Sequence, residues 1–420
     1  MNDSILNARE ERMNEVLNFL STSHLSILVK ANIPGPHKNL GEAHLLVRLF
    51  CNELKKNKRY KACKLFNTDD GPFALISFVS NDIKSIKLEM INLEENHELG
   101  RFIDLDVFGS SIPSLSRKEL GFSLRKCYLC GKDASYCSRN KSHSLDLLLS
   151  YIKECVMTYL TKQIELLLIK SMMTELDLED KFGLVTKSSQ GSHPDMNYQM
   201  MKKAQQAIIP YFKKLFEIGY QADNLINLLE KTRNIGIDAE QQMLKATGGI
   251  NAYKGLIFVL GITCLASGYE INHHQNFNSI FENIKTISLT INDDFKNPPI
   301  TSGLKAYHEY GFMGIRGEVK NGLPSVQSTL KIINPDEKHY LHRCLKQLIL
   351  ISEDTVFLKR SKSMDSYLKF KSAIKQLDIS NPDELKSFTV KAISENLSFG
   401  GSADLLITTL FLQSIKEFYT

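Results

Sequence analysis

The sequence has no tryptophan, and among its 420 residues there are only 11 prolines, 23 glycines and 8 cysteines. The missing tryptophan by itself excludes no class of protein. So little proline and glycine excludes a collagen-like or low-complexity disordered chain. The cysteines are too sparse for the disulfide framework of a small secreted protein. The N-terminal residues also lack the apolar segment of a secretory signal, so we expect a cytoplasmic protein with reduced thiols.

Long apolar runs are missing as well. The longest, Leu256 to Ser267, has about 12 residues, whereas a membrane helix needs roughly 20. Charge of one sign is not strongly in excess, because 52 basic and 47 acidic residues give a net charge of +5. This mild and dispersed surplus does not indicate nucleic acid binding. We therefore expect no nucleic acid and no membrane as partners, and anionic small molecules remain candidates.

The hydrophobic pattern changes near residue 145. Before it, apolar runs and alternation predict strands next to a helix, which gives an α+β domain over residues 1–150. After it, helical periodicity dominates and predicts a larger, mainly α-helical domain over residues 151–420. No linker rich in Pro, Gly or Ser intervenes, so we expect a continuous helix at the junction.

The expected elements of the first domain are a helix over residues 7–20 and strands over 25–33, 73–79 and 102–108. The expected helices of the second part cover residues 145–173, 198–219, 221–233, 252–267, 272–292, 338–352, 383–394 and 402–419.

The pair Asp104 and Asp106 is the first candidate site. On a strand, residues i and i+2 point to the same side, and two adjacent carboxylates repel each other unless a cation lies between them. Oxygen ligands of this kind suit Mg²⁺ held together with the phosphates of a substrate. The alternative is a solvated edge strand with two exposed acids. Basic residues that can neutralise a polyphosphate follow or precede the pair: Lys38 in a Pro-Gly-Pro loop, Arg101, Arg117, Arg125, Lys126 and Arg139.

Cysteines and a histidine form the second candidate site. The spacing Cys127-x2-Cys130-x6-Cys137-x5-His143 can bind zinc. It lacks the two close ligand pairs of the common zinc motifs. The alternative is a set of buried thiols with a histidine in the core or facing a phosphate.

Paired glycines next to helical segments form the third candidate site. Gly248 and Gly249 precede an apolar helix, and Gly400 and Gly401 precede the last one, where Ser402 is a plausible N-cap. Backbone N–H groups at such points can bind phosphate, although glycine pairs also mark ordinary helix ends. No Walker motif is present. Neighbouring residues able to bind or react with a phosphorylated substrate are Lys181, His193, Asp195, Glu240, Thr247, Asn251, Lys254, Arg316, Glu318, Asp354 and Asp404.

Two family resemblances follow from these motifs. Residues 1 to about 150, with AREER, NIPGP, GRFIDLDVF and RKCYLCGKDASYCSRNKSH, resemble the phosphoribosyl-dephospho-CoA transferases, which are the holo-acyl-carrier-protein synthases of citrate lyase. Residues from about 150 to 420, with GIDAEQQMLKATGGINAYKG, GFMGIRGEVKNG and SFGGSADLL, resemble the triphosphoribosyl-dephospho-CoA synthases. The chain looks like a fusion of the two enzymes.

The resemblance implies two reactions. The second half would convert ATP and 3′-dephospho-CoA to 2′-(5″-triphosphoribosyl)-3′-dephospho-CoA and adenine. The first half would transfer that group to a serine of the apo citrate lyase acyl carrier protein, the γ subunit, and release pyrophosphate. Such chemistry needs Mg²⁺, cations on the phosphates, a carboxylate base and an acid for the departing adenine. We expect Asp104 and Asp106 to hold Mg²⁺, His193 to be the acid, and Asp195, Glu240, Glu318 or Asp404 to supply the base.

Three alternatives remain. Some positions differ from the usual residues of the synthase family: Leu304, Tyr253, Val356, the flanks of Lys181 and the residues after Arg360. They favour a chain whose first half alone is active, with a second half that only binds the CoA derivative or a partner. The cysteine cluster would fit a zinc-dependent interaction module without catalysis. A related carrier-protein system, such as malonate decarboxylase, would use a similar prosthetic group.

Overall fold

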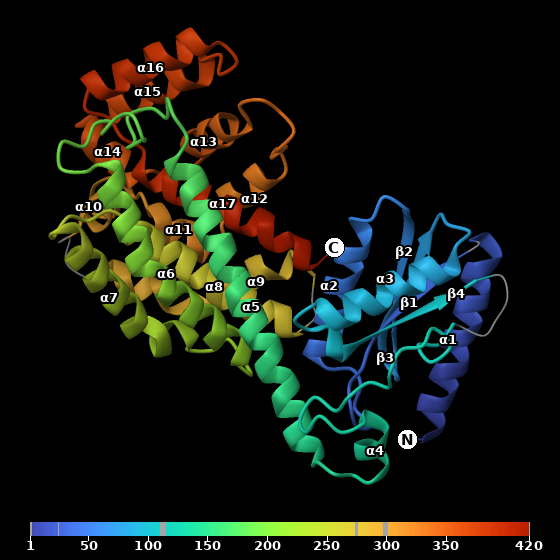
Figure 1. The fold of residues 1–420 in the computed structure, drawn as a ribbon. Helices are drawn as coiled ribbons and strands as arrows, with labels where there is room; N and C mark the ends of the chain where they lie inside the picture. The colour runs from blue at the N-terminus through green and yellow to red at the C-terminus, as the bar shows by residue number, and fades with distance from the viewer. Residues whose placement is uncertain (1, 24, 110–114, 274–275, 297–300, 420) are drawn as a thin grey trace. The chain divides into compact units, whose positions relative to one another are not determined.

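The computed structural model describes residues 2–23, 25–109, 115–273, 276–296 and 301–419. It divides into two compact units, of which unit 1 comprises Met1–Leu160, Ile271–His274 and Glu417–Thr420, and unit 2 comprises Thr161–Glu270 and Gln275–Lys416 (Figure 1). Helix α5 (Leu145–Leu176) contains the boundary between residues 160 and 161. The expected continuous helix at the junction is therefore confirmed.

Unit 1 is built on a four-stranded antiparallel sheet in the order β2-β3-β1-β4. The strands are β1 (Ser26–Ala31), β2 (Tyr60–Thr68), β3 (Gly71–Phe78) and β4 (Ile103–Phe108). The three expected strands are confirmed as β1, β3 and β4. The sequence pattern missed β2 because this edge strand alternates between exposed and half-buried residues and has no apolar run.

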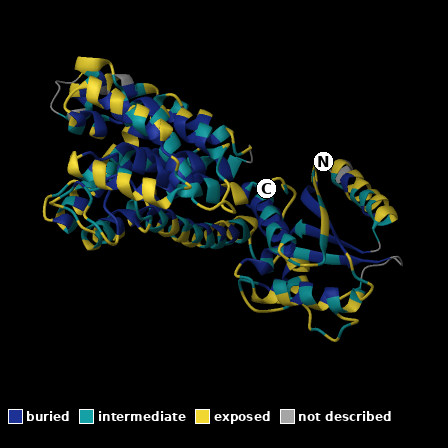
Figure 2. Ribbon diagram, turned by 90° about the horizontal axis from the view of Figure 1, so that it is seen from above, coloured by how far each residue is buried: buried dark blue, intermediate teal, exposed yellow. Residues whose placement is uncertain are grey.

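Helices α1 (Asn2–Thr22), α2 (Gly41–Lys55) and α3 (Ile83–Asn96) pack against the sheet of unit 1. The 3₁₀ turn η1 (Gly100–Phe102) precedes β4 in the chain, and the short helix α4 (Ala134–Arg139) follows it. Val16 of α1 packs with Leu28, Phe73, Leu75 and Phe108 in one apolar cluster. Figure 2 shows the central strands as largely buried. The sequence analysis did not identify α2, which begins without a capping side chain.

Unit 2 consists of helices and connecting loops, with no strand among its described residues. Its helices, with their ends, are α6 (Tyr198–Gln221), α7 (Leu228–Thr247), α8 (Lys254–His273), α9 (Ser279–Ile287), η2 (Leu289–Lys296), α10 (Ser302–Tyr310), α11 (Gly314–Lys320), α12 (Pro324–Leu330), α13 (Tyr340–Ile351), α14 (Thr355–Ser361), α15 (Met364–Gln376), α16 (Pro382–Ser394), α17 (Gly400–Ile415) and η3 (Lys416–Phe418). The expected α+β domain followed by a mainly helical one is confirmed.

Two helix predictions in unit 2 are wrong in their limits. The helix expected over 221–233 begins only at Leu228, because Asn227 before it is left-handed (φ 57°), and it continues to Thr247. The helix expected over 272–292 is divided into α9 and η2, and its positions 274 and 275 lie outside the described residues. The expected N-cap Ser402 lies inside α17, whose N-cap is Phe399.

Helix α8 carries the longest apolar run. It is the one helix among the described residues that is long and apolar enough to cross a membrane, and 78% of its apolar window is buried inside the protein. This burial is typical of the central helix of a helical domain. The expectation of a buried helix over this run is confirmed.

Glycines allow α6 and α8 to pack at very short range. A Cβ on Gly219 of α6 would lie 2.0 Å from the carbonyl oxygen of Leu265, and one on Gly268 of α8 would lie 2.1 Å from that of Phe216. Both obstacles are helix backbone, which cannot move aside as a side chain can. The core of unit 2 therefore requires glycine at this crossing.

Gly219→Ala should destabilise unit 2 because the new methyl group forces the two helices apart. Overpacking of this kind costs about 1–3 kcal/mol. The matched control is Gly236→Ala in α7, where a Cβ meets nothing within 4 Å. That change should stabilise the helix by up to about 1 kcal/mol. Thermal unfolding of both variants checks this, and equal effects of the two changes would contradict the packing.

Candidate active sites and a candidate metal centre

The Asp pair lies on β4, the edge strand of the sheet in unit 1. Ile103, Leu105 and Val107 are buried, and the two aspartates between them point to the other side. Their side chains are 38% (Asp104) and 45% (Asp106) exposed. The expected shared face of the pair follows from this alternation.

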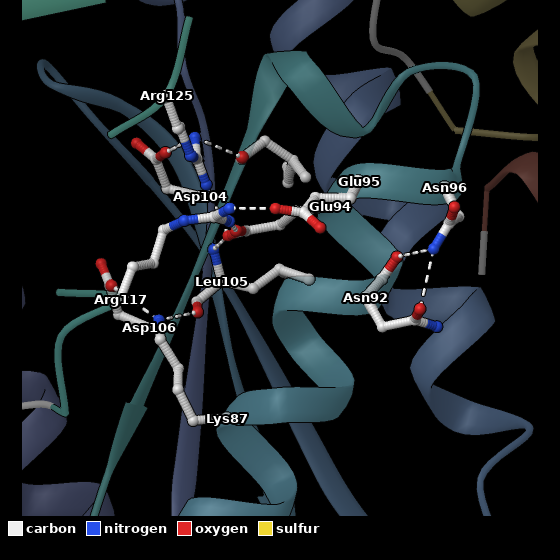
Figure 3. Close-up of polar contacts among 11 residues, drawn as sticks. Lys87, Asn92, Glu94, Glu95, Asn96, Asp104, Leu105, Asp106, Arg117 and Arg125 are labelled. Carbon is white, nitrogen blue, oxygen red and sulfur yellow. Dashed lines mark hydrogen bonds and ion pairs between the residues drawn. The ribbon is translucent and has the colours of Figure 1, made fainter. Parts of the chain in front are cut away.

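Glu94 of α3 connects the strand to two arginines (Figure 3). Its Oε1 accepts a hydrogen bond from the N–H of Leu105 at 2.8 Å and pairs with Arg125 Nη2 at 2.6 Å. Its Oε2 accepts from Arg117 Nη1 at 2.8 Å. Arg125 also pairs with Asp104 and donates to the carbonyl of Ile103 at 3.1 Å. Two of the predicted cations are thus fixed beside the pair.

Each aspartate of the pair has a cationic neighbour, Arg125 for Asp104 and Lys87 for Asp106. Burial raises the pKa of Asp104, the charge of Arg125 opposes this, and the charge of Asp106 raises it further. Lys87 Nζ lies 3.5 Å from Asp106 and donates to the carbonyl of Leu105 at 2.8 Å. Mutual repulsion between two oxygen donors on one face is what bound Mg²⁺ would relieve.

A second buried carboxylate gathers cations that the sequence analysis did not assign. Asp70, in the β2–β3 turn, has a fully buried side chain. Its Oδ2 lies 2.6 Å from Arg12 Nη1, 3.2 Å from Lys30 Nζ and 3.4 Å from Arg9 Nε. Burial would raise the pKa of Asp70, but the hydrogen bond from Arg12 and the charge of Lys30 outweigh it and hold the pKa below its usual range. Lys30 faces Asp104 across the β1–β4 pairing, so the cluster borders the Asp pair.

Lys38, which follows the Pro-Gly-Pro loop, lies near Lys30, Asp70 and Asp104. Burial and the nearby Lys30 lower the pKa of Lys38, while Asp70 and Asp104 oppose this. The Lys38 side chain donates to the carbonyl of Ile33. A Cβ on Gly71, which has φ +91°, would lie 3.0 Å from the Lys38 carbonyl oxygen, so the loop rests on the β2–β3 turn.

Three other predicted cations lie apart from the pair. Lys126 pairs with Asp133 at 2.7 Å, and Arg139 is exposed at the end of α4. Arg101 is half-buried in η1. Within the described residues, none of the three forms an ion pair with Asp104 or Asp106. Arg9, Arg12 and Lys30 were missed because their contacts to Asp70 join distant parts of the chain, although AREER was noticed as a motif.

The four predicted zinc ligands come together. One ligand atom from each of Cys127, Cys130, Cys137 and His143 lies within 4.8 Å of all the others. Cys130 Sγ is 3.4 Å from Cys137 Sγ and 3.3 Å from His143 Nε2. The arrangement has the donor set of a zinc centre.

Unit 2 contains a cavity of about 1200 Å³. Typical small-molecule sites measure roughly 300–1,000 Å³, so this one has room for more than one small substrate. Ten of the predicted site residues line it: His193, Asp195, Glu240, Asn251, Lys254, Arg316, Glu318, Asp354, Gly401 and Asp404.

Asp354 connects two helix N-termini at the cavity wall. Its Oδ1 accepts from the N–H groups of Val356 and Phe357 of α14, both at 3.0 Å. Its Oδ2 accepts from the N–H of Ser402 at 2.8 Å and from its hydroxyl at 2.9 Å, both in α17. Burial raises the pKa of Asp354 although these donors oppose it. Asp354 therefore caps the N-terminal ends of two helices. The sequence analysis expected it to bind the phosphates of the substrate.

Asp404 of α17 is the carboxyl group most strongly affected by its surroundings. Burial raises its pKa well above the usual range, and the charges of Asp354 and Glu175 raise it further. A Cβ on Gly255 would lie 2.2 Å from its Oδ2, so Gly255 is the residue that gives the carboxyl room against α8. A cavity-lining carboxyl with a raised pKa can keep its proton near neutral pH.

Other predicted residues form pairs along the wall. Lys254 Nζ lies 2.5 Å from Glu240 Oε1, and Arg316 lies over the ring of Phe258 at 5.8 Å. Glu318 accepts from the N–H of Ser325 at 3.1 Å. Burial raises the pKa of Glu318, and the bonds from Ser325 oppose this.

His193 is held by two hydrogen bonds. Arg360 Nη2 donates to its Nδ1 at 3.0 Å, so Nε2 carries the proton that is shared with Ser398 Oγ at 2.7 Å. Burial lowers the pKa of His193 to about 4, and the charge of Arg360 adds to this. The neutral ring has little tendency to give up a proton, which argues against the expected role of acid for adenine.

The remaining predicted residues are occupied elsewhere. Lys181 is buried, and its Nζ donates to Oε1 and to the carbonyl of Glu175, both at 2.7 Å. Gly248 ends α7 as a left-handed C-cap, and the N–H groups of both Gly248 and Gly249 bond to Leu244. Thr247 donates to the carbonyl of Met243 at 2.9 Å. Neither these residues nor Gly400 are among those that line the cavity, whereas Gly401 is, and the phosphate contacts expected of them stay predictions.

Some cavity residues were missed from the sequence. Arg233 lies two helical turns before Glu240 on α7, and this spacing was the available indication. Glu353 precedes α14 and accepts a hydrogen bond from the N–H of Met313 at 2.8 Å, and Lys359 lies in the last turn of α14. Arg360 also donates to the carbonyl of Ser192 at 2.9 Å. All four line the cavity.

Comparison with known families agrees with this division into two sites. The model of the family "Apo-citrate lyase phosphoribosyl-dephospho-CoA transferase" matches residues 2–159. The model of the family "ATP:dephospho-CoA triphosphoribosyl transferase" matches residues 161–419. The chain belongs to both families. It is a tandem transferase, as the motifs indicated.

Curated relatives share this organisation. The protein CitXG of Leuconostoc mesenteroides subsp. cremoris is 31% identical over 91% of this chain and 90% of its own length. The CitXG of Haemophilus influenzae is 32% identical over 80% of this chain and 78% of its own length. A 2-(5″-triphosphoribosyl)-3′-dephosphocoenzyme-A synthase of Haemophilus ducreyi is 32% identical over 68% of this chain and 99% of its own length.

Asp354→Ala should destabilise unit 2 by about 1–4 kcal/mol, because one helix cap is worth about 0.5–2 kcal/mol and this residue caps two helices. The matched control is Ser363→Ala, which removes one exposed N-cap bond to Ser366 of α15 and should cost about 1 kcal/mol. Denaturant unfolding measures both. If Asp354→Ala were as stable as Ser363→Ala, capping of two helices by Asp354 would not contribute to the stability of unit 2.

Proposed function

We propose that the chain makes and attaches the prosthetic group of citrate lyase. Unit 2 joins ATP to 3′-dephospho-CoA with release of adenine, and unit 1 transfers the product to a serine of the apo acyl carrier protein, the γ subunit. The observation that carries the proposal is that each family match corresponds to its own charged site. One is a carboxylate pair among cations, and the other is a large charged cavity. We place the protein in the cytoplasm.

In the proposed transfer, the serine oxygen of the carrier forms a bond to the phosphorus next to the ribose, and the bond to the pyrophosphate breaks. The departing pyrophosphate needs positive charge. Arg9, Lys30 and Lys38 supply it beside the Asp pair, and Asp70 holds Arg9 and Lys30 near each other against their repulsion. Arg125 fixes Asp104 in position.

Mg²⁺ is the metal that we propose for this site. Asp104 and Asp106 would hold it, and when bound it would neutralise charge on the phosphates. Zinc, the other metal predicted from the sequence, has no chemical part in either reaction as we propose it.

In the proposed synthesis, the 2′-hydroxyl of dephospho-CoA forms a bond to the ribose carbon that carries adenine, and the bond to adenine breaks. Lys254, Arg316 and Arg233 line the cavity as counter-charges for the triphosphate. The ribose hydroxyl must lose a proton, and Asp195 and Glu240 are the exposed or half-exposed carboxylates at the wall that suit a base. Adenine must gain a proton, and we assign this to Asp404 in place of His193.

The first test separates the two sites. Asp104→Ala should lower transfer to the carrier at least about 100-fold and leave adenine release unchanged, whereas Lys254→Ala should do the reverse. Adenine is measured by chromatography, and transfer by the mass of the carrier.

The controls are Asp69→Ala, an exposed neighbour of the buried Asp70, and Lys245→Ala, an exposed lysine of α7. Both should keep both activities. If either site variant lost both activities, the assignment of one reaction to each unit would be wrong.

The unmodified chain also tests the alternatives. If it releases no adenine but transfers a supplied triphosphoribosyl compound to the carrier, only the first half is active. Transfer to the carrier protein of malonate decarboxylase, measured in place of the citrate lyase carrier, distinguishes the related system from the citrate lyase system.

The second test concerns the proton for adenine. Asp404→Asn keeps the shape but cannot donate an acidic proton, so adenine release should fall about 10²–10⁴-fold. A general acid works only while it is protonated. Adenine release by the unmodified chain should therefore fall as pH rises through the raised pKa of Asp404, and the variant should lack this decrease.

His193→Gln is the matched comparison. A neutral amide can still accept from Arg360, so we expect adenine release within about 10-fold of the unmodified chain, since one neutral acceptor of this hydrogen bond replaces another. The opposite ranking, with His193→Gln severe and Asp404→Asn mild, would return the acid role to His193.

A further inference from the structure

The segment that carries the cysteine cluster has almost no core of its own. Within the described stretch 115–150, Cys127 and Cys137 are the only buried residues, each 7% exposed. Before α5 begins at Leu145, the segment contains one short helix, α4, and otherwise turns and loops. Too little apolar surface is buried here to fix the chain, which is the situation in which small modules depend on a metal or on disulfides.

The geometry of the four side chains fits a metal. In a tetrahedral zinc site with Zn–S of about 2.3 Å and Zn–N of about 2.0 Å, neighbouring ligand atoms lie roughly 3.5–3.8 Å apart. The two separations from Cys130 Sγ, 3.4 Å to Cys137 Sγ and 3.3 Å to His143 Nε2, are close to these edges. A disulfide would need about 2.05 Å between sulfurs and would leave one thiol over.

The backbone around the cluster forms a tight turn suited to metal ligands. The N–H of Gly131, which has φ +72°, donates to the carbonyl of Cys127 at 3.0 Å, and the N–H of Cys127 donates to that of Lys132 at 2.6 Å. Thiolates with an imidazole select zinc over Mg²⁺ or Ca²⁺.

The turn also carries a residue of the transferase site. Arg125 lies two positions before Cys127, and its carbonyl accepts from the N–H of Ala134 at 2.9 Å, on the other side of the turn. Its side chain reaches Glu94 and Asp104. Next to Cys127, Tyr128 stacks on Tyr151 of α5 with ring centres 5.5 Å apart.

We infer that Cys127, Cys130, Cys137 and His143 bind one zinc ion, and that this ion holds Arg125 in position beside Asp104. The ion is structural, since four protein ligands leave no position for a substrate. Arg125 is thereby a positioning residue for the Asp pair. The positioning of Arg125, which is the second clause, rests on the proposed transfer reaction. The binding of zinc, which is the first clause, does not.

Metal analysis of the full chain tests the first clause. The chain as purified should contain one zinc per molecule, and after exchange with Co²⁺ it should show the absorption bands of tetrahedral cobalt with thiolate ligands. Cys130→Ser, at an exposed ligand, should contain less than a tenth of the zinc. Cys155→Ser, at a half-buried thiol outside the cluster, should contain all of it. A chain without zinc that also does not take up Co²⁺, or a Cys130 variant that keeps the metal, would overturn the site.

The two activities of the same protein test the second clause. Cys130→Ser should transfer the group to the carrier at least tenfold more slowly and release adenine at the rate of the unmodified chain, which also shows that unit 2 remains folded. Arg125→Lys should slow transfer while keeping zinc. Zinc loss without any loss of transfer would overturn the positioning role and leave the metal site in place. Absence of transfer in the zinc-loaded, unmodified chain would instead be a failure of the proposed function.

Discussion

The ion pairs of Asp70 show the constraint on which both units depend. A carboxylate with no exposed surface must find positive charge or give up its own, because an unpaired buried charge costs several kcal/mol. Asp70 meets Arg9 and Arg12 of α1 and Lys30 of β1, so one side chain fastens a helix, a strand and a turn. Cations that are assembled for this structural reason are then close together at the border of the Asp pair.

Unit 2 meets the same constraint in a different way. Asp354 is satisfied mainly by backbone and hydroxyl donors, and Lys181 neutralises Glu175. Burial and the charges of Asp354 and Glu175 raise the pKa of Asp404 well above its usual range. The same burial that stabilises the helix ends therefore raises the pKa of a carboxyl group at a cavity wall, which suits the proton donor that we propose for the departing adenine.

Local rules made part of this predictable. Strands β1, β3 and β4 contain apolar runs, and the two-residue period of a strand was enough to place Asp104 and Asp106 on one face. The Cys/His spacing likewise indicated a common site, since its members lie within 17 positions. Arg9 and Asp70, or His193 and Arg360, are far apart in sequence, and only the tertiary structure brings them together. The sequence left both interpretations of Gly248 and Gly249 open, because a glycine pair between two helices can end one or begin the next.

The positions at which the chain departs from the synthase family bear on whether unit 2 is active. Phe182, which flanks Lys181, and Tyr253 and Leu304 are buried and do not line the cavity. The Tyr253 hydroxyl accepts a hydrogen bond from Gln205 at 2.8 Å. Val356 lines the cavity, and so do Arg360 and Lys362 on either side of Ser361. The substitutions thus fall mostly in the packing behind the wall, whereas the cations and carboxyl groups that the reaction requires face the cavity. Packing changes of this kind alter stability more readily than they remove a reaction, because neighbouring side chains can be replaced together with little loss. The structure therefore favours two active halves over a second half that only binds.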